Sequence, residues 1–187
     1  MKKSVALFIL ILISPIIAGV YGIIHDQITY TISPEYYTKF KFIQFGFINE
    51  EDHTILGRPK LIVSQIGFLA TWWMGLPIGI ILGLVGLKHR DGKTMFIITL
   101  KAILVAVIIA FITGLIGLAF GQLFLANKPI EYFENWFLPE NLKDYKSFIA
   151  VGSMHNFSYL GGLTGLIAGI TYSIKQKRKS NKSKESV

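Results

Sequence analysis

The sequence predicts an all-α transmembrane protein, a four-helix bundle with a small β-containing loop outside the membrane. Three observations support this fold class: long apolar runs, basic residues gathered at the ends of those runs, and glycines spaced at helical intervals. Apolar residues make up 52% of the 187-residue chain and charged residues only 16%. Apolar runs longer than about 18 residues are typical of helices that cross a bilayer. We therefore expect a single membrane domain over residues 1–187.

The predicted spans follow from the apolar runs. Each run reaches the roughly 20 residues that cross a hydrocarbon core of about 30 Å. The first run follows Lys2 and Lys3, and a basic start before an apolar stretch also begins a secretory signal peptide. Because this stretch is longer than the apolar core of such a peptide (about 7–15 residues), we expect an uncleaved helix. The predicted spans are residues 4–24, 61–87, 95–126 and 148–174.

Basic residues predict the orientation of the spans. They collect at the N-terminus, in the short link after the second run, and at residues 175–187, which we expect to form a basic cytoplasmic tail. The loops at 25–60 and 127–147 mix basic residues with carboxylates. The positive-inside rule then places both termini in the cytoplasm. We expect the protein to lie in the lipid bilayer and its basic tail to attract anionic lipid. Because the basic residues cluster at the helix ends and in the tail, we do not expect it to bind nucleic acid.

Both outer loops carry local patterns. Residues 28–33 alternate and are rich in β-branched side chains, and residues 39–42 alternate again, which predicts a strand–turn–strand lid. The Ser-Pro-Glu sequence at 33–35 is typical of a helix start. The polar stretch at 49–52 predicts a turn at the tip of the loop. Aromatic residues at 129–139 indicate either a short interfacial helix or a plain aromatic belt.

Glycines recur at intervals of three or four in the last three runs. This spacing places them on one helix face, where the missing side chains let two backbones approach closely. We therefore expect the second, third and fourth spans to form a tight trio beside the first. The glycines assigned to helix packing are Gly75, Gly79, Gly83, Gly114, Gly117, Gly121, Gly161, Gly165 and Gly169.

Polar residues near the outer end of the spans form the candidate site. Counting about 1.5 Å per residue from the inner lysine of each span places His25, Gln122 and His155 about 30–33 Å up, at the outer boundary of the hydrocarbon. Polar side chains inside a membrane are costly and usually face the bundle interior. Imidazole and carboxylate groups there could hold a divalent metal, relay protons or bind a lipid headgroup. The candidate ligand-binding residues are His25, Asp26, Gln27, Glu35, Trp72, Trp73, Gln122, His155 and Asn156.

A simpler interpretation of this polar level stays open. Polar residues at helix ends also meet water and headgroups without binding a ligand. The chain has no cysteine, which excludes disulfides and thiolate metal sites. No residue pattern predicts a cofactor, a defined metal site or a known catalytic residue, so we do not expect an enzyme.

Four segments of the chain carry distinctive motifs: HDQ-x-T at 25–29, PEY-aromatic-T at 34–38, ATWW-x-G at 70–75 and HN-x-SY at 155–159. In these segments the chain resembles a family of small four-span bacterial integral membrane proteins for which no activity is established. The family has about this size and the same order of segments. The resemblance therefore implies architecture and no activity.

Three function hypotheses follow from these patterns. The leading one is a small polytopic protein of the bacterial inner membrane that binds a lipid headgroup or a small polar ligand at its outer face. The second is an assembly or scaffold subunit whose glycine faces pack against another copy or a membrane partner. The third is a metal-dependent membrane hydrolase that uses His25, Asp26, Glu35 and His155. No charged residue lies in the middle of a span, so a channel or transporter is the weakest interpretation.

Overall fold

Four long helices dominate the computed structural model, which describes residues 1–48, 54–139 and 141–185. All four helices are long and apolar enough to cross a membrane, so the predicted all-α, multi-pass membrane architecture is confirmed. The first helix runs about two turns further than predicted, because residues 25–32 continue it. The long helices are α1 (Lys3–Ile32), α4 (Pro59–Gly86), α5 (Gly92–Leu123) and α6 (Tyr145–Glu185).

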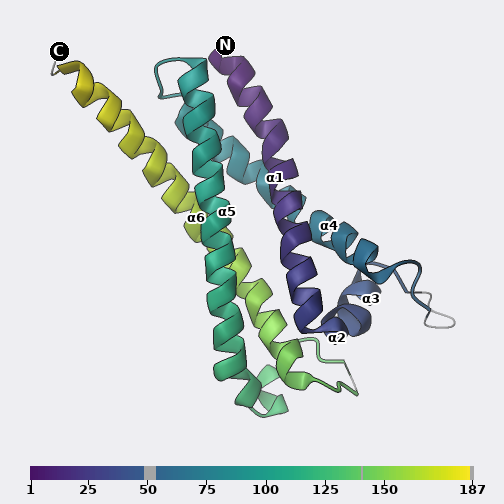
Figure 1. The fold of residues 1–187 in the computed structure, drawn as a ribbon. Coiled ribbons are helices and arrows are strands. Elements are labelled where there is room, and N and C mark those ends of the chain that lie inside the picture. Colours follow the sequence, from purple (N-terminus) through teal and green to yellow (C-terminus); the bar gives the residue numbers. More distant parts are fainter. Residues whose placement is uncertain (49–53, 140, 186–187) are drawn as a thin grey trace.

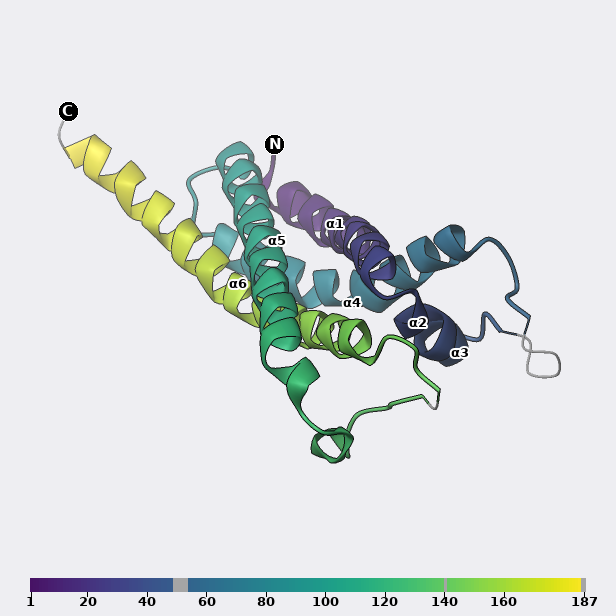
Figure 2. The ribbon, with the colours of Figure 1, turned by 60° about the horizontal axis from the view of Figure 1, so that its bottom comes forward.

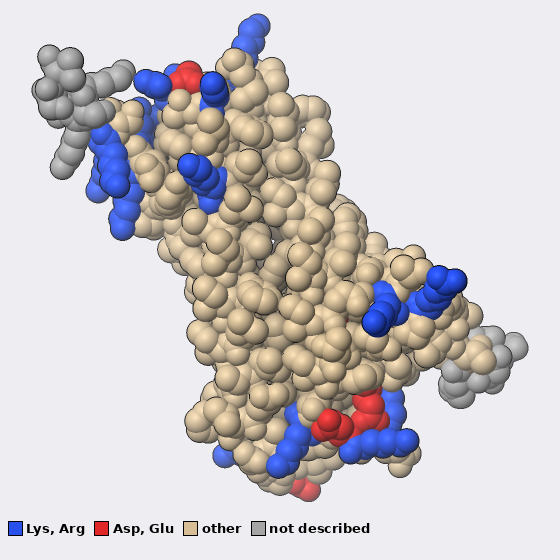
Figure 3. All heavy atoms as spheres, in the orientation of Figure 1, with Lys and Arg blue, Asp and Glu red and all other residues tan. Residues whose placement is uncertain are grey.

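The bundle has two chemically different ends. The start of α1 and the end of α6 lie at the same end, which we call the basic end (Figure 1). The opposite end carries the chain that follows α1 and the chain that follows α5, and we call it the loop end (Figures 1 and 2). On the face drawn in Figure 3, charged side chains gather near the two ends and the band between them is almost free of charge. This distribution matches a protein whose middle lies in hydrocarbon.

The predicted strand–turn–strand lid is wrong, because its residues are helical. Residues 28–32 complete α1, and Tyr37–Lys41 form a π-helix, η1, between the short helices α2 (Pro34–Tyr36) and α3 (Phe42–Gln44). Packing explains the difference: the helical turns bury Tyr36, Tyr37 and Phe42 in one cluster, and such burial overrides a β propensity. The predicted helix start is present, since the side chain of Ser33 accepts a hydrogen bond from the N–H of Tyr36.

Little β structure occurs in this loop. Among the residues that the structure describes, it amounts to one antiparallel bridge between Ile48 and Ile55. The predicted turn at 49–52 lies outside the described residues. In the other loop, two single turns of 3-10 helix occur, η2 (Leu125–Asn127) and η3 (Ile130–Phe133). Only one turn of the aromatic segment at 129–139 is therefore helical.

The long helices form two intimate pairs, α1 with α4 and α5 with α6. In the first pair, Gly22 and Gly67 face each other so closely that a Cβ on either would collide with backbone atoms of the other helix. The expectation that the second, third and fourth spans form one tight trio is therefore wrong, because the second span, α4, pairs with the first, α1. The sequence interpretation missed the small residues Ser14, Gly19 and Gly22 on the first helix, which let α4 approach it.

Each glycine assigned to helix packing lies where a neighbouring helix comes close. Gly75, Gly79 and Gly83 of α4 meet Ser14 and Leu7 of α1. The remaining six lie in the α5–α6 contact: Gly114, Gly117, Gly121, Gly161, Gly165 and Gly169, which meet Ser158, Phe157, Ala150, Ala110, Ala106 and Ala102 respectively.

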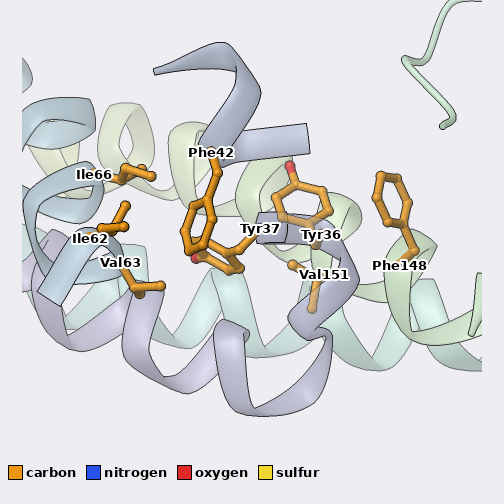
Figure 4. Close-up of a cluster of buried hydrophobic side chains, with 8 residues drawn as sticks. All are labelled: Tyr36, Tyr37, Phe42, Ile62, Val63, Ile66, Phe148 and Val151. Atoms are coloured by element: carbon orange, nitrogen blue, oxygen red, sulfur yellow. The ribbon is translucent and has the colours of Figure 1, made fainter. Parts of the chain in front are cut away.

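Two clusters of buried apolar side chains connect the pairs. One, at the loop end, gathers Tyr36, Tyr37 and Phe42 against α4 and α6 and is drawn in Figure 4. The other lies toward the basic end and joins Leu10 of α1 and Leu82 of α4 to residues of α5. The site described next lies between these clusters.

Candidate functional site

A buried group of three polar side chains lies between α1 and α6, and we call it the His–Asp–His cluster: His25 and Asp26 of α1 and His155 of α6. His25 and Asp26 are each 3% exposed and His155 is 8% exposed. Asp26 Oδ1 lies 3.0 Å from His25 Nδ1 and 3.4 Å from His155 Nε2. One donor atom from each residue lies within 4.8 Å of the others.

The outer nitrogen of each imidazole in the cluster has its own partner. His155 Nδ1 lies 2.9 Å from the carbonyl oxygen of Val151, one helical turn earlier. A carbonyl oxygen only accepts, so Nδ1 of His155 carries the proton and donates. His25 Nε2 lies 3.1 Å from the hydroxyl oxygen of Ser158 on α6. These bonds fix both rings so that their other nitrogens face the carboxylate of Asp26.

This arrangement leaves one contact of the cluster without a hydrogen bond. With its proton on Nδ1, a neutral His155 has a lone pair at Nε2, and the ionised carboxylate of Asp26 also only accepts. The two acceptors face each other at 3.4 Å, and Nε2 of His155 has no hydrogen-bond partner in the part of the chain that the structure describes. Such a pairing in a buried site is unfavourable unless a positive charge lies between the two atoms.

Aromatic side chains cover the cluster on the side of the loop end. The ring of Tyr36 stacks on His155 with 4.9 Å between ring centroids and 28° between ring planes. Phe148 packs against Tyr36 in turn, as Figure 4 shows. The hydroxyl groups of Tyr37 and Thr29 are 2.6 Å apart, which ties η1 to the last turns of α1. The cluster is therefore closed toward the loops.

On the opposite side the cluster borders a cavity of about 90 Å³ lined by all four long helices. That volume holds about six water-sized groups, since one needs roughly 15 Å³ by this measure. Along α1 the lining runs from Asp26 to Ser14, a distance of about 18 Å at the rise of an α-helix. The hydroxyls of Ser14 and Thr71, which also line the cavity, donate to backbone carbonyl oxygens. The other walls carry hydroxyl groups near the cluster and are apolar further away: Tyr21, Ser158 and Tyr159, then Ile17, Met74, Ile78, Ile103 and Val107.

Two of the predicted site residues have partners elsewhere. Gln27 Nε2 donates to the carbonyl oxygen of Lys60 at 2.7 Å, at the start of α4. Gln27 lies two residues after His25, a rotation of about 200° around the helix, so these two side chains point to opposite sides of α1. Glu35 accepts hydrogen bonds from the backbone N–H groups of Lys143 and Asp144, at 2.9 and 2.7 Å. The predicted grouping of Glu35 with the histidines is not what the structure shows.

The other predicted site residues face outward. Trp72 is 41% exposed and Trp73 is 51% exposed on α4. Gln122 and Asn156 are exposed as well. Each directly follows a buried residue, Gly121 or His155. A helix rotates by about 100° per residue, and here that rotation points the side chain away from the bundle interior. The position of each residue along its helix could thus be estimated from the sequence, whereas the direction of its side chain around the helix could not.

Three residues of the site were missed by sequence reasoning. Tyr21 lies one turn before His25, with ring centroids 5.7 Å apart, and Ser158 lies one turn after His155. Helical spacing of three or four from a predicted site residue was the signal that could have found both. Tyr36 had no such signal, because its contact with His155 depends on how the loop folds back.

Glu35 gives a prediction that depends on pH. Partial burial raises the pKa of Glu35, but the Lys39 ammonium and the N–H groups of Asp144 and Lys143 outweigh it and lower that pKa from 4.5 to about 2. A carboxylate with a lowered pKa stabilises the folded state above its unfolded pKa. We expect Glu35→Gln to lower the melting temperature at neutral pH, and the difference from wild type to shrink as the pH falls from 4.5 toward 2.

The measurement is a thermal unfolding series in detergent at several pH values. Glu134→Gln, at an exposed position in the other loop of the loop end, is the matched control and should leave the melting temperature unchanged. A difference between wild type and Glu35→Gln that is the same at every pH would contradict the role of this carboxylate.

No protein-family model matches this chain, and neither does any curated protein or solved structure. The fold and the site therefore define its class on their own. It is a multi-pass helical membrane protein with a buried His–Asp–His cluster at the end of an apolar cavity.

Proposed function

We propose that this protein binds an amphiphilic lipid molecule, with the polar end at the His–Asp–His cluster and the apolar part along the cavity. The observation that carries the proposal is the composition of the cavity wall: polar groups gather at one end, and the rest is mostly apolar, with its two hydroxyl groups bonded to backbone carbonyls. A small soluble ligand would leave the apolar part of the cavity unused. A hydrocarbon chain without a polar end would leave the cluster unpaired.

The polar end of the cavity supports recognition of such a ligand. Tyr21 has a buried hydroxyl with no hydrogen-bond partner among the described residues, and it lines the cavity beside the cluster. A hydroxyl can donate to or accept from a ligand, so it adapts to a phosphate, a carbonyl or an alcohol. Inside a bilayer the apolar part of a ligand gains little by leaving the surrounding lipid, so binding depends mostly on these polar groups and on fit.

The route of entry also favours a membrane-borne ligand. Tyr36 and Phe148 close the cluster toward the loops, whereas Tyr159, which lines the cavity, is 42% exposed on the outer surface of α6. That surface belongs to a helix apolar enough to lie in a bilayer. A lipid could therefore reach the cavity sideways from the membrane.

Filling the cavity tests the proposal. Gly162 lines the cavity, and a Cβ at this position would meet only Met74 Cε, at 3.9 Å, which is an ordinary contact. Gly162→Leu should therefore fold and place its side chain in the cavity. We expect wild type purified in mild detergent to retain a lipid species enriched over the bulk membrane extract, and Gly162→Leu to lose it by tenfold or more, measured by native mass spectrometry.

Gly162→Ala is the matched control and should retain the lipid, because one methyl group leaves most of the cavity open. Melting temperatures of the three proteins show whether each is folded. A wild type that carries only the lipid composition of the bulk membrane would refute the proposal, and so would equal retention by Gly162→Leu.

We also propose that the basic end lies in the cytoplasm. Its lysines and arginines support this orientation, and the loop end carries basic and acidic side chains together. Because the chain lacks cysteine, a single introduced cysteine is a clean label. In intact bacterial cells a membrane-impermeant maleimide should label Lys128→Cys at the loop end, and should label Lys88→Cys only after permeabilisation. Labelling in the reverse order would overturn this orientation.

A further inference from the structure

The unpaired contact between His155 and Asp26 needs a positive charge, and the surrounding atoms indicate what supplies it. His25 Nδ1 lies 3.0 Å from Asp26 Oδ1, and His155 Nε2 lies 3.4 Å from the same oxygen. A metal ion with ligand bonds of about 2.1 Å has neighbouring donor atoms about 3.0 Å apart in octahedral geometry and about 3.4 Å apart in tetrahedral geometry. The two distances from Asp26 Oδ1, 3.0 and 3.4 Å, lie within this range.

We propose that His25, Asp26 and His155 bind a divalent first-row transition-metal ion such as zinc. The ligands are Nδ1 of His25, one carboxylate oxygen of Asp26 and Nε2 of His155. Two imidazoles and one carboxylate form a donor set that binds zinc and iron(II) with positions left open for a further ligand. The cluster lines the cavity, so the open positions face it.

The remaining nitrogen of each imidazole fits this role. Metal-binding histidines usually donate their other N–H to a fixed acceptor, which sets the orientation of the ring. The other nitrogen of His155 lies 2.9 Å from the carbonyl oxygen of Val151, and that of His25 lies 3.1 Å from the hydroxyl of Ser158. Both partners belong to α6, so the helix that supplies one ligand also orients the other.

The burial of the site also favours a bound cation. His155 is only 8% exposed, and its Nε2 atom has no hydrogen-bond partner among the described residues. A lone pair and a carboxylate that face each other at low dielectric repel, and a cation between them reverses the sign of that interaction. The site does not depend on the amphiphile, because all three ligands come from the protein.

A hydrogen-bonded serine nucleophile is the other chemistry that these contacts suggest. Asp26, His25 and Ser158 follow one another in the order of a hydrolytic triad. Acyl transfer also needs N–H donors for the developing oxyanion. Ser158 lies inside the continuous helix α6, whose backbone N–H groups are used within the helix. That chemistry also leaves Nε2 of His155 unpaired, whereas a metal ion pairs it.

Zinc binding by the full chain tests the inference. The protein is purified in mild detergent with an affinity tag that contains no histidine, stripped with a chelator, and titrated with zinc against a fluorescent zinc indicator. We expect one zinc ion per chain and a higher melting temperature with zinc than without it. His155→Ala and Asp26→Asn should weaken zinc binding by at least about 100-fold, since loss of even an outer partner costs about 10–100-fold.

His89→Ala is the matched control, because His89 is also a buried histidine, with Nε2 3.0 Å from the hydroxyl of Ser173 at the basic end. It should bind zinc as wild type does, and Gly162→Leu should as well. Asp26→Asn keeps the shape of the side chain, so it remains informative if His155→Ala does not fold. A wild type that binds no zinc would show that a proton fills the contact and would overturn the inference. Unchanged binding by both cluster variants would overturn it too, by showing an adventitious ion only.

Discussion

Gly22→Val is expected to prevent the chain from reaching its folded state. A Cβ on Gly22 would collide with the backbone carbonyl of Gly67 and with the hydroxyl of Thr71. Backbone atoms cannot move aside as a flexible side chain can, so α1 and α4 would have to separate. Overpacking a core costs about 1–3 kcal/mol where side chains can yield, and this contact should cost more than about 3 kcal/mol.

The measurement for Gly22→Val is the yield of monodisperse protein after extraction in detergent, together with its melting temperature. Gly162→Val is the control, because it places the same side chain on a helix where only Met74 Cε comes within 4 Å of the new Cβ. The control should remain folded. A Gly22→Val protein with the yield and melting temperature of wild type would mean that α1 and α4 are not in backbone contact.

Tyr36→Ala is the second change with a large expected effect. The side chain of Tyr36 is 6% exposed and contacts His155, Phe148 and Phe40. Truncation of a large buried aromatic residue to alanine costs about 3–5 kcal/mol. Because this ring is the cover of His155, we expect α2 and η1 to detach from α6 and the cluster to become accessible to water.

Thermal unfolding and hydrogen exchange measure the two parts of this prediction. Tyr36→Ala should lower the melting temperature and raise amide exchange over residues 34–44. Ile43→Ala is the control in the same segment, since Ile43 is 56% exposed and should be almost neutral. If Tyr36→Ala behaved like Ile43→Ala, the packing of the Tyr36 ring on His155 would contribute nothing to the stability of the loop end.

The membrane helices could be predicted from the sequence because their signal is local. A run of apolar residues longer than the bilayer thickness indicates a span whatever its partners are. Which helices pair could not be predicted in the same way. Close packing needs small residues on both helices. Ser14, Ala18 and Gly22 of α1 do recur at an interval of four, but such a face does not tell which helix packs against it.

The loop after α1 was misread because alternation was taken as the mark of a strand. Residues 39–42 alternate, yet they occupy a π-helix and the start of α3. The burial of Phe42 with Ile62, Val63 and Phe148 is decided by tertiary contacts that no short window of sequence contains. Short apolar segments are ambiguous between strand and helix for this reason.

The sequence predicted at which level of the membrane the site residues lie, but not which way their side chains point. The rise of a helix fixes how far along the membrane a residue lies, which brought His25 and His155 to one level. The direction of a side chain around the helix depends on which neighbour the helix packs against. Gln27 and Asn156 therefore share the level of the cluster, and neither belongs to it.

The pairing of the helices has a consequence for synthesis of the protein. The contact between Gly22 and Gly67 lies wholly within α1 and α4, so this half can assemble while the ribosome is still making the rest. The cavity cannot, since His155 and Gly162 arrive on α6, the last helix. A chain arrested before α6 would therefore hold the assembled pair of α1 and α4, an α5 without its partner helix, and the imidazole and carboxylate of His25 and Asp26 without the α6 residues that pair with them.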